Sequence, residues 1–418
     1  MNEMRLPLLA LVLGSLLGIP AVGQVSLPAP TGPYPVGRLS LAWTDQSRIE
    51  DVGPTAGKPR EVLAYVYYPA TATGSKVEYF PGLVGIEGAN ESRFLRQQFG
   101  AVWNSVTSGA IHTNAYDAPP MPTGKKKFPV LVFSPGSLAP VLAYQLQLQE
   151  LASRGYVIFG LEHGTDSALL IRPDHTLLSY VSRRPPDPGP PTVGGLEANR
   201  DQVIRRTADI GFAINQIEIL AKEASSIFRN RLDLSQIGVF GHSEGGKAAV
   251  RACQVDPRVR ACLNQDGEMF GIPFNSPDPI PSLLPEQSIR APVAVIYVAE
   301  PGIPDAHLAA MNVTRAQYED WRSAKNRALR SFLKERTRDS YLITINAPGF
   351  VHASFMDIRL LGGNPSPEEL RNHRTGTEIT RQYFDANLHT GEQNTWRKFA
   401  LTPEVGMTIE RLSGPVAR

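Results

Sequence analysis

Short, strongly apolar runs recur along this chain and alternate with amphipathic segments, and this alternation limits the folds open to it. Two of the runs are Phe128–Phe133 (FPVLVF) and Tyr156–Leu161 (YVIFGL). Continuous apolar runs of this length are typical of strands buried on both faces of a parallel sheet. Between them, Tyr144–Ser153 is amphipathic and ends at Arg154-Gly155, which favours a helix. The order strand, helix, strand predicts a parallel α/β sheet.

The same alternation continues along most of the chain. Further strands are expected at Val36–Thr44, Glu61–Tyr68, Ile237–Phe240, Ala261–Gln265, Ala291–Ala299 and Tyr341–Ile345, the last of these closing the series. Further helices are expected at Leu196–Ala224, Gly245–Ala252, Thr314–Arg336 and Glu378–Leu388. Tyr79–Lys127 is expected to be an irregular insertion, and Arg183–Pro191 (RRPPDPGPP) a loop. No internal repeat or linker separates two cores, so we expect one domain with insertions.

Charge and composition exclude several classes of protein. The chain has 42 Lys and Arg against 40 Asp and Glu, which gives no basic surface for nucleic acid. With 42% hydrophobic and 20% charged residues, its composition is that of a globular protein and not of a disordered one. No cluster of His and Cys has the spacing of metal ligands. We therefore expect no nucleic-acid partner, no metal and no cofactor.

The first 23 residues have the pattern of an export signal. Leu6–Ile19 is almost wholly apolar, and the small residues Ala21 and Gly23 favour cleavage before Gln24. The apolar run is shorter than the ~20 residues that a membrane span needs, so no transmembrane anchor is expected. These features predict a signal peptide at residues 1–23 and one exported domain, periplasmic or secreted, at residues 24–418.

The chain contains two cysteines, Cys253 and Cys262, nine positions apart. An oxidising compartment favours a disulfide between them. Such a bond would close a loop of about ten residues, a constraint worth roughly 2.5–3 kcal/mol. The alternative is a pair of buried thiols.

Gly241-His242-Ser243-Glu244-Gly245 is the strongest functional signal. It lies between an expected strand and an Ala-rich helix, which is the context that a nucleophile elbow requires. Ser243 would then lie in a strained turn with its hydroxyl clear of the sheet. Glycine is needed two positions before and after it, because side chains there would collide with the neighbouring strand and helix. The alternative interpretation is a glycine-rich turn that begins an ordinary helix.

A serine hydroxyl is a poor nucleophile without a base, and in this layout the histidine follows the nucleophile in the chain. Four histidines do so: His307, His352, His373 and His389. His352 comes a few residues after the expected last strand, where the α/β-hydrolase layout places its base. His307 precedes a charged helix, and the other two lie in polar sequence. His352 is therefore the candidate base, with a half-buried structural histidine as the alternative.

The acid that would orient this histidine has three candidates. Asp266 follows the expected strand Ala261–Gln265, whereas Glu300 and Asp305 follow the strand that ends at Ala299. The later strand is the commoner position in hydrolases. Position alone leaves the candidates nearly even.

Five segments, taken in this order, resemble the platelet-activating-factor acetylhydrolase family of α/β-hydrolases. They are PVLVFSPG, RGYVIFGLEHGTDSA, GHSEGGKAA, LNQDGEMFG and PGFVHASFMD, and the earlier GPYPVG and REVLAYVYYPA look like bacterial members. The likeness extends from Gly32 to Leu388. It implies an α/β-hydrolase fold with a mostly parallel central sheet, flanking helices and insertions near the pocket.

The resemblance also implies roles for particular residues. The family's acid lies in a D-x-x-M-F segment after the nucleophile, here Asp266–Phe270, so the resemblance favours Asp266. Its first oxyanion donor lies in an S-H-G-x motif, which corresponds here to Ser134–Ser137. The backbone N–H groups of Ser137 and Glu244 are therefore the expected oxyanion hole.

This sequence departs from the family pattern at three places. Pro135 replaces the motif's histidine, Glu244 lies where an aromatic residue is common, and Ile303–Arg336 is an extra helical insertion. Backbone donors survive the first change. The departures therefore bear on acyl and head-group preference and not on the catalytic groups.

Together these features predict a secreted serine carboxylic-ester hydrolase that cleaves short-acyl (phospho)lipid or related esters through an acyl-serine intermediate. Its partners would be a small-molecule ester or phospholipid and, transiently, a lipid surface; no particular oligomeric state is predicted. The alternative is a broad-specificity esterase or polyester hydrolase, which shares every catalytic residue and differs in pocket shape. A non-catalytic binding protein would have lost Ser243, Asp266 or His352, and a dienelactone-type enzyme would have cysteine at position 243.

Overall fold

The structure is a computed structural model that describes most of the chain. The described residues are 27–81, 96, 99–103, 106, 111–167, 169–172, 174, 176–183, 192–273, 279–299, 302, 304–361, 364–388 and 406–413. The expected signal peptide at residues 1–23 and most of the expected loop at 183–191 lie outside these residues. None of the helices in the described ranges is long and apolar enough to cross a membrane.

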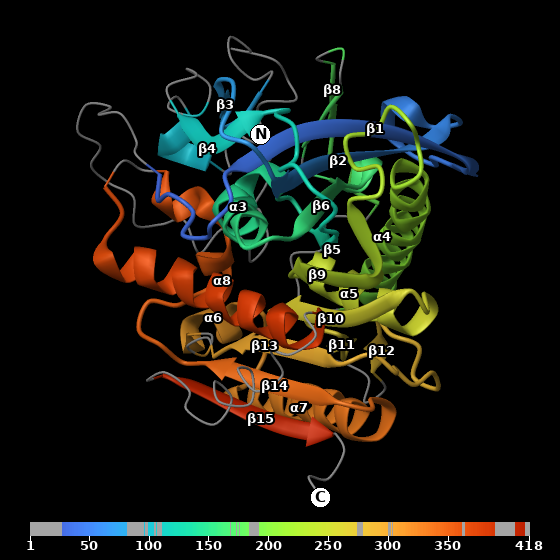
Figure 1. The fold of residues 1–418 in the computed structure, drawn as a ribbon. Coiled ribbons are helices and arrows are strands. Elements are labelled where there is room, and N and C mark those ends of the chain that lie inside the picture. The colour runs from blue at the N-terminus through green and yellow to red at the C-terminus, as the bar shows by residue number, and fades with distance from the viewer. Residues whose placement is uncertain are drawn as a thin grey trace, which may run out of the picture.

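A large twisted sheet forms the centre of the molecule (Figure 1). Its strands, in spatial order, are β15 (Met407–Ser413), β14 (Ser340–Ile345), β13 (Val293–Val298), β10 (Val259–Gln265), β9 (Leu232–His242), β5 (Phe128–Ser134), β6 (Val157–Glu162), β2 (Pro59–Pro69), β1 (Val36–Ile49), β4 (His112–Asp117) and β3 (Lys76–Glu78). Neighbouring strands from β14 to β6 are parallel. β15, β2 and β1 pair antiparallel. The predicted mostly parallel sheet is confirmed.

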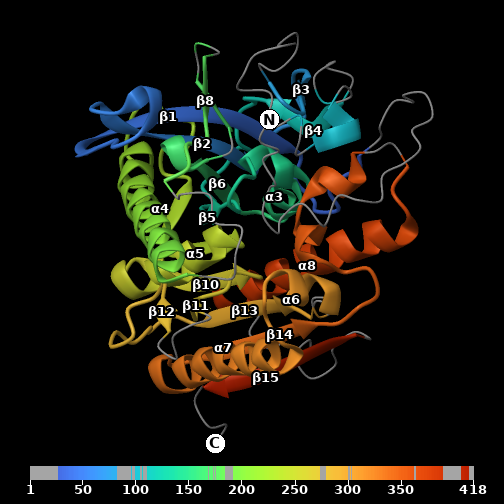
Figure 2. The same ribbon diagram turned by 180° about the vertical axis from the view of Figure 1, so that it is seen from behind.

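Helices cover both faces of the sheet (Figures 1 and 2). One face carries α3 (Gln145–Ser153) and α8 (Pro367–Leu388), and the other carries α4 (Val193–Leu220), α5 (Glu244–Val255) and α7 (Arg315–Arg336), which follows the short α6 (Asp305–Ala310). Residues of β5 alternate between the two cores. Leu131 and Phe133 pack on the α3 side, whereas Val130 and Val132 pack on the α4 side. This burial on both faces explains the continuous apolar run in the sequence.

Smaller elements complete the described chain. They are the hairpins β7 (Leu169–Ile171) with β8 (Leu177–Ser179) and β11 (Phe270–Gly271) with β12 (Ile280–Pro281), and the single 3₁₀ turns η2 (Gly53–Thr55), η3 (Gly100–Val102), η4 (Val141–Tyr144), η5 (Gly164–Asp166), η6 (His352–Phe355) and η7 (Asp357–Leu360).

Three expectations about elements need correction. Tyr341–Ile345 does not close the sheet, because β15 pairs antiparallel with β14 beyond it. The segment expected to be irregular between Tyr79 and Lys127 contains β4, which pairs parallel with β1. α8 begins at Pro367 and not at Glu378. Its first turns are polar and half-exposed, and because they lack an apolar stripe the sequence did not indicate them.

A disulfide joins Cys253 on α5 to Cys262 on β10, with their Cα atoms 6.3 Å apart. The expected bond is confirmed, and the alternative of two thiols is wrong for this structure. Because α5 begins directly after Ser243, the bond ties the helix behind the elbow to the strand that ends before Asp266.

Candidate active site

Ser243 lies at the turn between β9 and α5. Its backbone has φ +54° and ψ −119°, a conformation that residues other than glycine adopt only at a cost. Its N–H donates to the carbonyl of Gln265, the last residue of β10, at 2.8 Å. The turn is therefore held against the neighbouring strand, and the Ser243 side chain is left partly exposed.

The two glycines of the motif leave no space for a side chain. A Cβ atom on Gly245 would lie 2.0 Å from the carbonyl oxygen of Ser134, and one on Gly241 would lie 2.5 Å from the same atom. Both distances are far inside van der Waals contact. The end of β5 therefore packs directly against the elbow, and this close approach requires glycine at both positions.

His352 and Asp266 are joined by a short hydrogen bond. Nδ1 of His352 lies 2.6 Å from Oδ2 of Asp266, whose other oxygen accepts the N–H of Val298 at 2.9 Å. The Asp266 side chain is 9% exposed and that of His352 is 38% exposed. An Nδ1–H donated to the carboxylate leaves the second ring nitrogen of His352 free to act as a base.

The His352 ring lies beside the elbow. It packs on the ring of His242, the residue before Ser243, with centroids 4.3 Å apart. Burial, together with the nearby His352, holds the pKa of His242 well below its usual range, so His242 is neutral. The Nδ1 of His242 lies 2.8 Å from the hydroxyl of Tyr144, which fixes the ring. No pattern in the sequence indicates this contact with Tyr144.

Two rival residues that the structure describes, Asp305 and His373, pair with other groups. Asp305 begins α6, where its side chain is 84% exposed and pairs with Arg315. His373 is buried on α8, 3.1 Å from Asp357. Glu300 and His389 lie outside the described residues. Of the three acids proposed from sequence, the structure brings Asp266 to His352.

The two expected oxyanion donors belong to segments that adjoin Ser243. Glu244 is the first residue of α5, and a helix N-terminus favours negative charge. Ser137 follows Gly136, where a Cβ atom would lie only 3.4 Å from the Cβ of Ser243. The loop after β5 therefore runs directly past the serine.

The side chain of Glu244 is buried and paired. Its Oε2 accepts from Nζ of Lys247 at 3.0 Å and from the amide of Asn199 at 3.1 Å. Lys247 lies one helical turn further along α5, so the ion pair is formed within the first turn of this helix. The charge of Glu244 is therefore balanced locally by Lys247.

Helix α7, which lies in the expected insertion, approaches the loop that follows Asp266. Nζ of Lys325 lies 2.5 Å from Oε1 of Glu268 and 3.6 Å from the centroid of the Trp321 ring. Burial lowers the pKa of Lys325, which the nearby Glu268 partly offsets. Helix α7 therefore contacts the chain two residues beyond the candidate acid.

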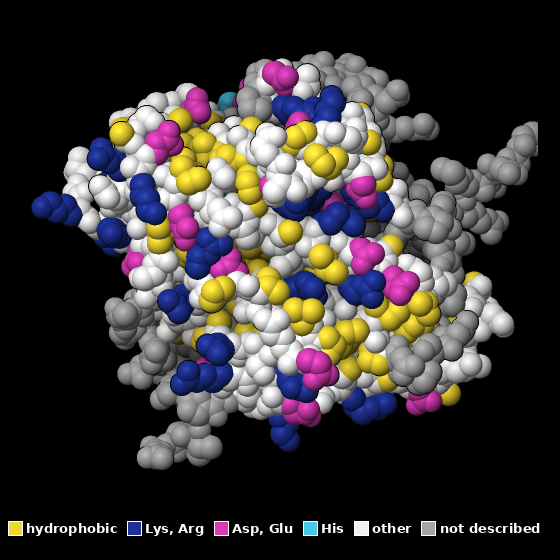
Figure 3. Space-filling model, turned by 90° about the vertical axis from the view of Figure 1, so that its right-hand side faces the viewer, with side chains coloured by type: hydrophobic (Ala, Val, Ile, Leu, Met, Phe, Trp, Pro, Cys, Tyr) yellow, Lys and Arg dark blue, Asp and Glu magenta, His cyan; other side chains and the backbone are white. Residues whose placement is uncertain are grey.

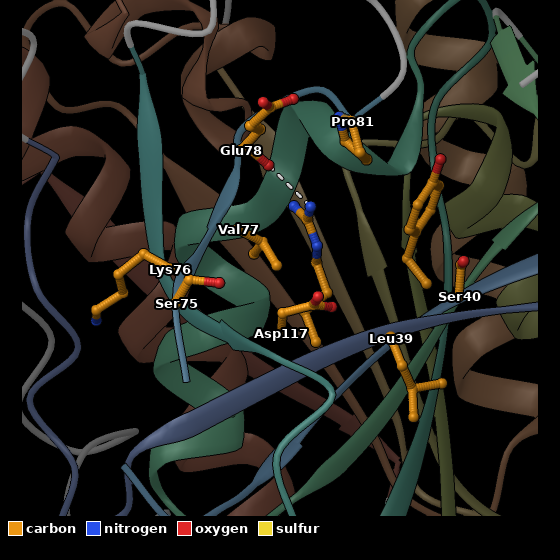
Figure 4. Close-up of a pocket in the computed structure, with 10 residues that line it drawn as sticks. Leu39, Ser40, Ser75, Lys76, Val77, Glu78, Pro81 and Asp117 are labelled. Carbon is orange, nitrogen blue, oxygen red and sulfur yellow. Dashed lines mark hydrogen bonds between the residues drawn. The ribbon is translucent and has the colours of Figure 1, made fainter. Parts of the chain in front are cut away.

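A cavity of about 310 Å³ lies on the N-terminal strands and not at Ser243 (Figure 4). Leu39 of β1, Glu78 of β3 and Asp117 of β4 are among its lining residues, and Arg38 donates to the carbonyl of Glu78 at 2.8 Å. Across the described ranges, no group of three or more His, Cys, Asp and Glu side chains is placed to hold a metal ion.

Comparison with known proteins supports the family resemblance. A family model described as platelet-activating factor acetylhydrolase, isoform II, matches residues 19–174. A probable 1-alkyl-2-acetylglycerophosphocholine esterase of Arthroderma benhamiae is 25% identical over 262 residues, covering 60% of this chain and 61% of the relative. A platelet-activating factor acetylhydrolase of Cavia porcellus is 24% identical over 286 residues, covering 61% and 58%. The chain thus spans about three fifths of the length of the curated relatives it matches.

A solved structure, the ferulic acid esterase from Streptomyces cinnamoneus, superposes with a TM-score of 0.60 at 21% identity and covers 86% of this chain and 92% of its own. At this identity the likeness shows the fold. The chain has the α/β-hydrolase fold, and its resemblance to the platelet-activating-factor acetylhydrolase family is confirmed.

Proposed function

We propose that this protein is a serine carboxylic-ester hydrolase. The observation that carries the proposal is the strained Ser243 turn with the Asp266–His352 hydrogen bond of 2.6 Å beside it. A nucleophile, a base and an orienting acid in chain order Ser, Asp, His match the α/β-hydrolase arrangement. The family resemblance and the shared fold support the same reaction class.

In the proposed mechanism His352 takes the proton of the Ser243 hydroxyl as the serine oxygen attacks the ester carbonyl carbon. Asp266 keeps the Nδ1–H of His352 in place and stabilises the imidazolium. The N–H groups of Ser137 and Glu244 bind the oxygen that becomes negative. His352 then protonates the leaving alcohol, and an acyl-serine remains. Water, activated by the same histidine, releases the acid and restores Ser243.

The proposed substrate is a short-acyl phospholipid or a related ester. The support is the name of the fungal relative, which specifies an acetylated glycerophosphocholine. Export is proposed on two grounds: the apolar segment within residues 1–23 and the disulfide, which is typical of oxidising compartments. Transient contact with a lipid surface belongs to the same proposal.

A broad-specificity esterase or polyester hydrolase is the second candidate. It would use the same catalytic residues, and the solved structure that shares this fold is a ferulic acid esterase, which is a reason to test aromatic esters. The contact between α7 and Glu268 is the feature of this chain expected to separate the two candidates, because it lies next to the acid's loop.

The test is a substrate panel on the purified wild-type protein. It contains p-nitrophenyl esters from acetate to palmitate, an sn-2-acetyl phospholipid and methyl ferulate. Preference for the acetyl phospholipid supports the first candidate, and faster cleavage of ferulate or long-chain esters supports the second. A fluorophosphonate probe should label Ser243, as read by peptide mass spectrometry. Absence of both hydrolysis and labelling would overturn the proposed function.

A further inference from the structure

A second Ser–His–Asp hydrogen-bond chain lies beneath the candidate site. The Oγ of Ser134 lies 2.8 Å from Nε2 of His163, and Nδ1 of His163 lies 2.9 Å from Oδ2 of Asp209. These residues come from the end of β5, from the position after β6 and from α4. All three are fully buried, so no substrate can reach them and they do not form a second active site.

The protonation states of Asp209 and His163 follow from their surroundings. Burial raises the pKa of Asp209, but its ion pair with Arg60, with two contacts of 2.8 Å, lowers it more and keeps the carboxylate ionised. Burial lowers the pKa of His163 to about 4, so the ring is neutral. Asp209 therefore accepts the Nδ1–H of His163, and the bare Nε2 accepts the hydroxyl proton of Ser134. The direction of the Ser134 hydroxyl is fixed.

The peptide group that joins Pro135 to Gly136 is held at both its carbonyl and its N–H. Arg206, one turn before Asp209 on α4, donates to the carbonyl of Pro135 at 2.5 Å. The N–H on the other side of the same peptide bond, that of Gly136, donates to the hydroxyl of Tyr144 at 3.1 Å. Arg206 is fully buried and also donates to the carbonyl of Asp166. The peptide plane after Pro135 thus has little freedom to rotate.

The following peptide carries the N–H of Ser137. Its carbonyl, on Gly136, faces the N–H of Ala139 at 3.4 Å. In a trans peptide the N–H and the C=O point in opposite directions, so fixing the Gly136 carbonyl also sets the direction of the Ser137 N–H. A shift of Ser134 or Pro135 would move this donor relative to Ser243, which is adjacent to Gly136.

We infer that Ser134, His163 and Arg206 are positioning residues that hold the proposed oxyanion donor, Ser137 N–H, near Ser243, and that Asp209 serves to fix the tautomer of His163. The inference rests on the proposed function, since it assigns these residues to the same ester hydrolysis. Loss of one oxyanion donor costs about 10²–10³-fold in turnover. A misplaced donor is expected to cost about 10- to 100-fold, because small displacements already cost up to ~10²-fold.

The test compares two substitutions of one histidine. In His163→Asn the side-chain amide occupies the place of Nδ1. The variant therefore keeps the hydrogen bond to Asp209 and loses the one to Ser134. In His163→Gln the amide occupies the place of Nε2, which keeps Ser134 and loses Asp209. We expect His163→Asn to lower kcat about 10- to 100-fold with little change in KM, and His163→Gln to retain most of the wild-type kcat.

Ser134→Ala removes only the hydroxyl and serves as the variant least apt to disturb folding. We expect the same fall in kcat as for His163→Asn. An aryl boronic acid that forms a tetrahedral adduct with Ser243 should bind both variants more weakly by a similar factor, because its oxygen occupies the oxyanion position. A residue with only a structural role would lower the unfolding temperature and leave kcat and boronate affinity unchanged.

Tyr156→Phe is the matched control. Tyr156 immediately precedes the other end of β6, is fully buried and donates to Asp385 at 2.7 Å. Its loss also removes a buried hydrogen bond, and the partner of that bond, Asp385, lies on α8 and not in the loop after β5. We expect lower thermal stability and an unchanged kcat.

The outcomes separate this inference from the proposed function. An active wild type, with Ser134→Ala and His163→Asn both at wild-type kcat, would overturn the positioning role alone. Equal losses in His163→Asn and His163→Gln, with Ser134→Ala unaffected, would do the same. A wild type without esterase activity and without phosphonate labelling would overturn the proposed function and this inference with it.

Discussion

Ser243 and Asp266 both have positive φ angles, +54° and +57°, at the ends of the adjacent parallel strands β9 and β10. Such a backbone costs on the order of 1–3 kcal/mol at a residue other than glycine. Hydrogen bonds from Ser243 N–H to Gln265 and from Asp266 N–H to Ile296 hold the two turns. The proposed nucleophile and acid therefore lie at the carboxyl ends of two central strands. Their strained backbone is held there by hydrogen bonds to the neighbouring strands.

The first prediction concerns Ser243. Ser243→Ala should lower kcat by about 10⁶-fold, since removal of the nucleophile disables the triad as a unit. Ser243→Gly should be equally inactive yet more stable than Ser243→Ala by about 1 kcal/mol, because only glycine adopts a positive φ freely. Denaturant unfolding of both variants measures the difference. Equal stability would contradict the strain, and retention of more than a few per cent of activity would contradict the nucleophile.

The second prediction concerns the acid. Asp266→Asn should lower kcat by about 10⁴-fold, because His352 loses its orienting carboxylate and takes the wrong tautomer. Asp305→Asn is the control, since this residue is exposed and pairs with Arg315 at the surface. Steady-state kinetics on one p-nitrophenyl ester decide between them. A larger loss in Asp305→Asn would move the acid to the later strand.

At the scale of elements, strands buried on both faces were predictable and the edge of the sheet was not. β5 and β6 stand out because every residue in them is buried and nearly all are apolar. β15, MTIERLS, is a half-exposed edge strand whose polar residues resemble those of a loop. Edge strands carry little hydrophobic signal because they pack on one side only.

The residues of the candidate site also divide into those that the sequence indicates and those that it does not. Ser243 and His352 could be found because each has a local motif or a place in the order of strands. Asp266 needed the family resemblance, because position left three acids nearly even. The His163–Asp209 pair spans 46 positions and joins the end of a strand to a helix, so no local pattern indicates it.

The third prediction concerns the link between α5 and β10. Cys253→Ser should lower the free energy of unfolding by about 2.5–3 kcal/mol, as expected for a closed loop of about ten residues. Activity at room temperature should be unchanged, while thermal inactivation should be faster. Reductant should destabilise the wild type and leave the variant unaffected. Two alkylated thiols in the native, unreduced protein would contradict the bond.

At the scale of the whole molecule, charged side chains are scattered on the surface but form a connected network in the interior. On the face in Figure 3, basic and acidic side chains are interspersed. Inside, Arg60 bonds to Glu50, Asp166 and Asp209 in one network that joins β2 to α4. Buried charges of this kind are costly to leave unpaired, so the network fixes α4 relative to the sheet. α4 in turn carries Asp209 and Arg206 to the loop after β5.

The fourth prediction follows from Glu162, buried at the end of β6. Burial raises its pKa to about 8 from 4.5, so the folded protein keeps a proton that the unfolded chain releases between these values. The contribution of Glu162 to the free energy of unfolding should therefore fall as the pH rises from 4.5 to about 8. Glu162→Gln has no proton to lose, so its stability relative to the wild type should increase across this window. Urea unfolding at several pH values measures it, and parallel curves would contradict the buried acid.

The adjacent His163 gives the last prediction, with the opposite sign. Its pKa is lowered by burial from 6.5 to about 4, so between these values the unfolded chain binds a proton that the folded protein does not. The contribution of His163 to the free energy of unfolding should therefore fall as the pH drops from 6.5 toward 4, and it opposes the contribution of Glu162 where the two windows overlap. His163→Gln cannot titrate, so its stability relative to the wild type should increase as the pH drops from 6.5 toward 4, and between pH 4.5 and 6.5 the variant should keep the slope set by Glu162. An acid limb of unchanged slope in His163→Gln would mean that His163 is already charged in the folded protein. The neutral ring that accepts the Ser134 hydroxyl would then be ruled out as well.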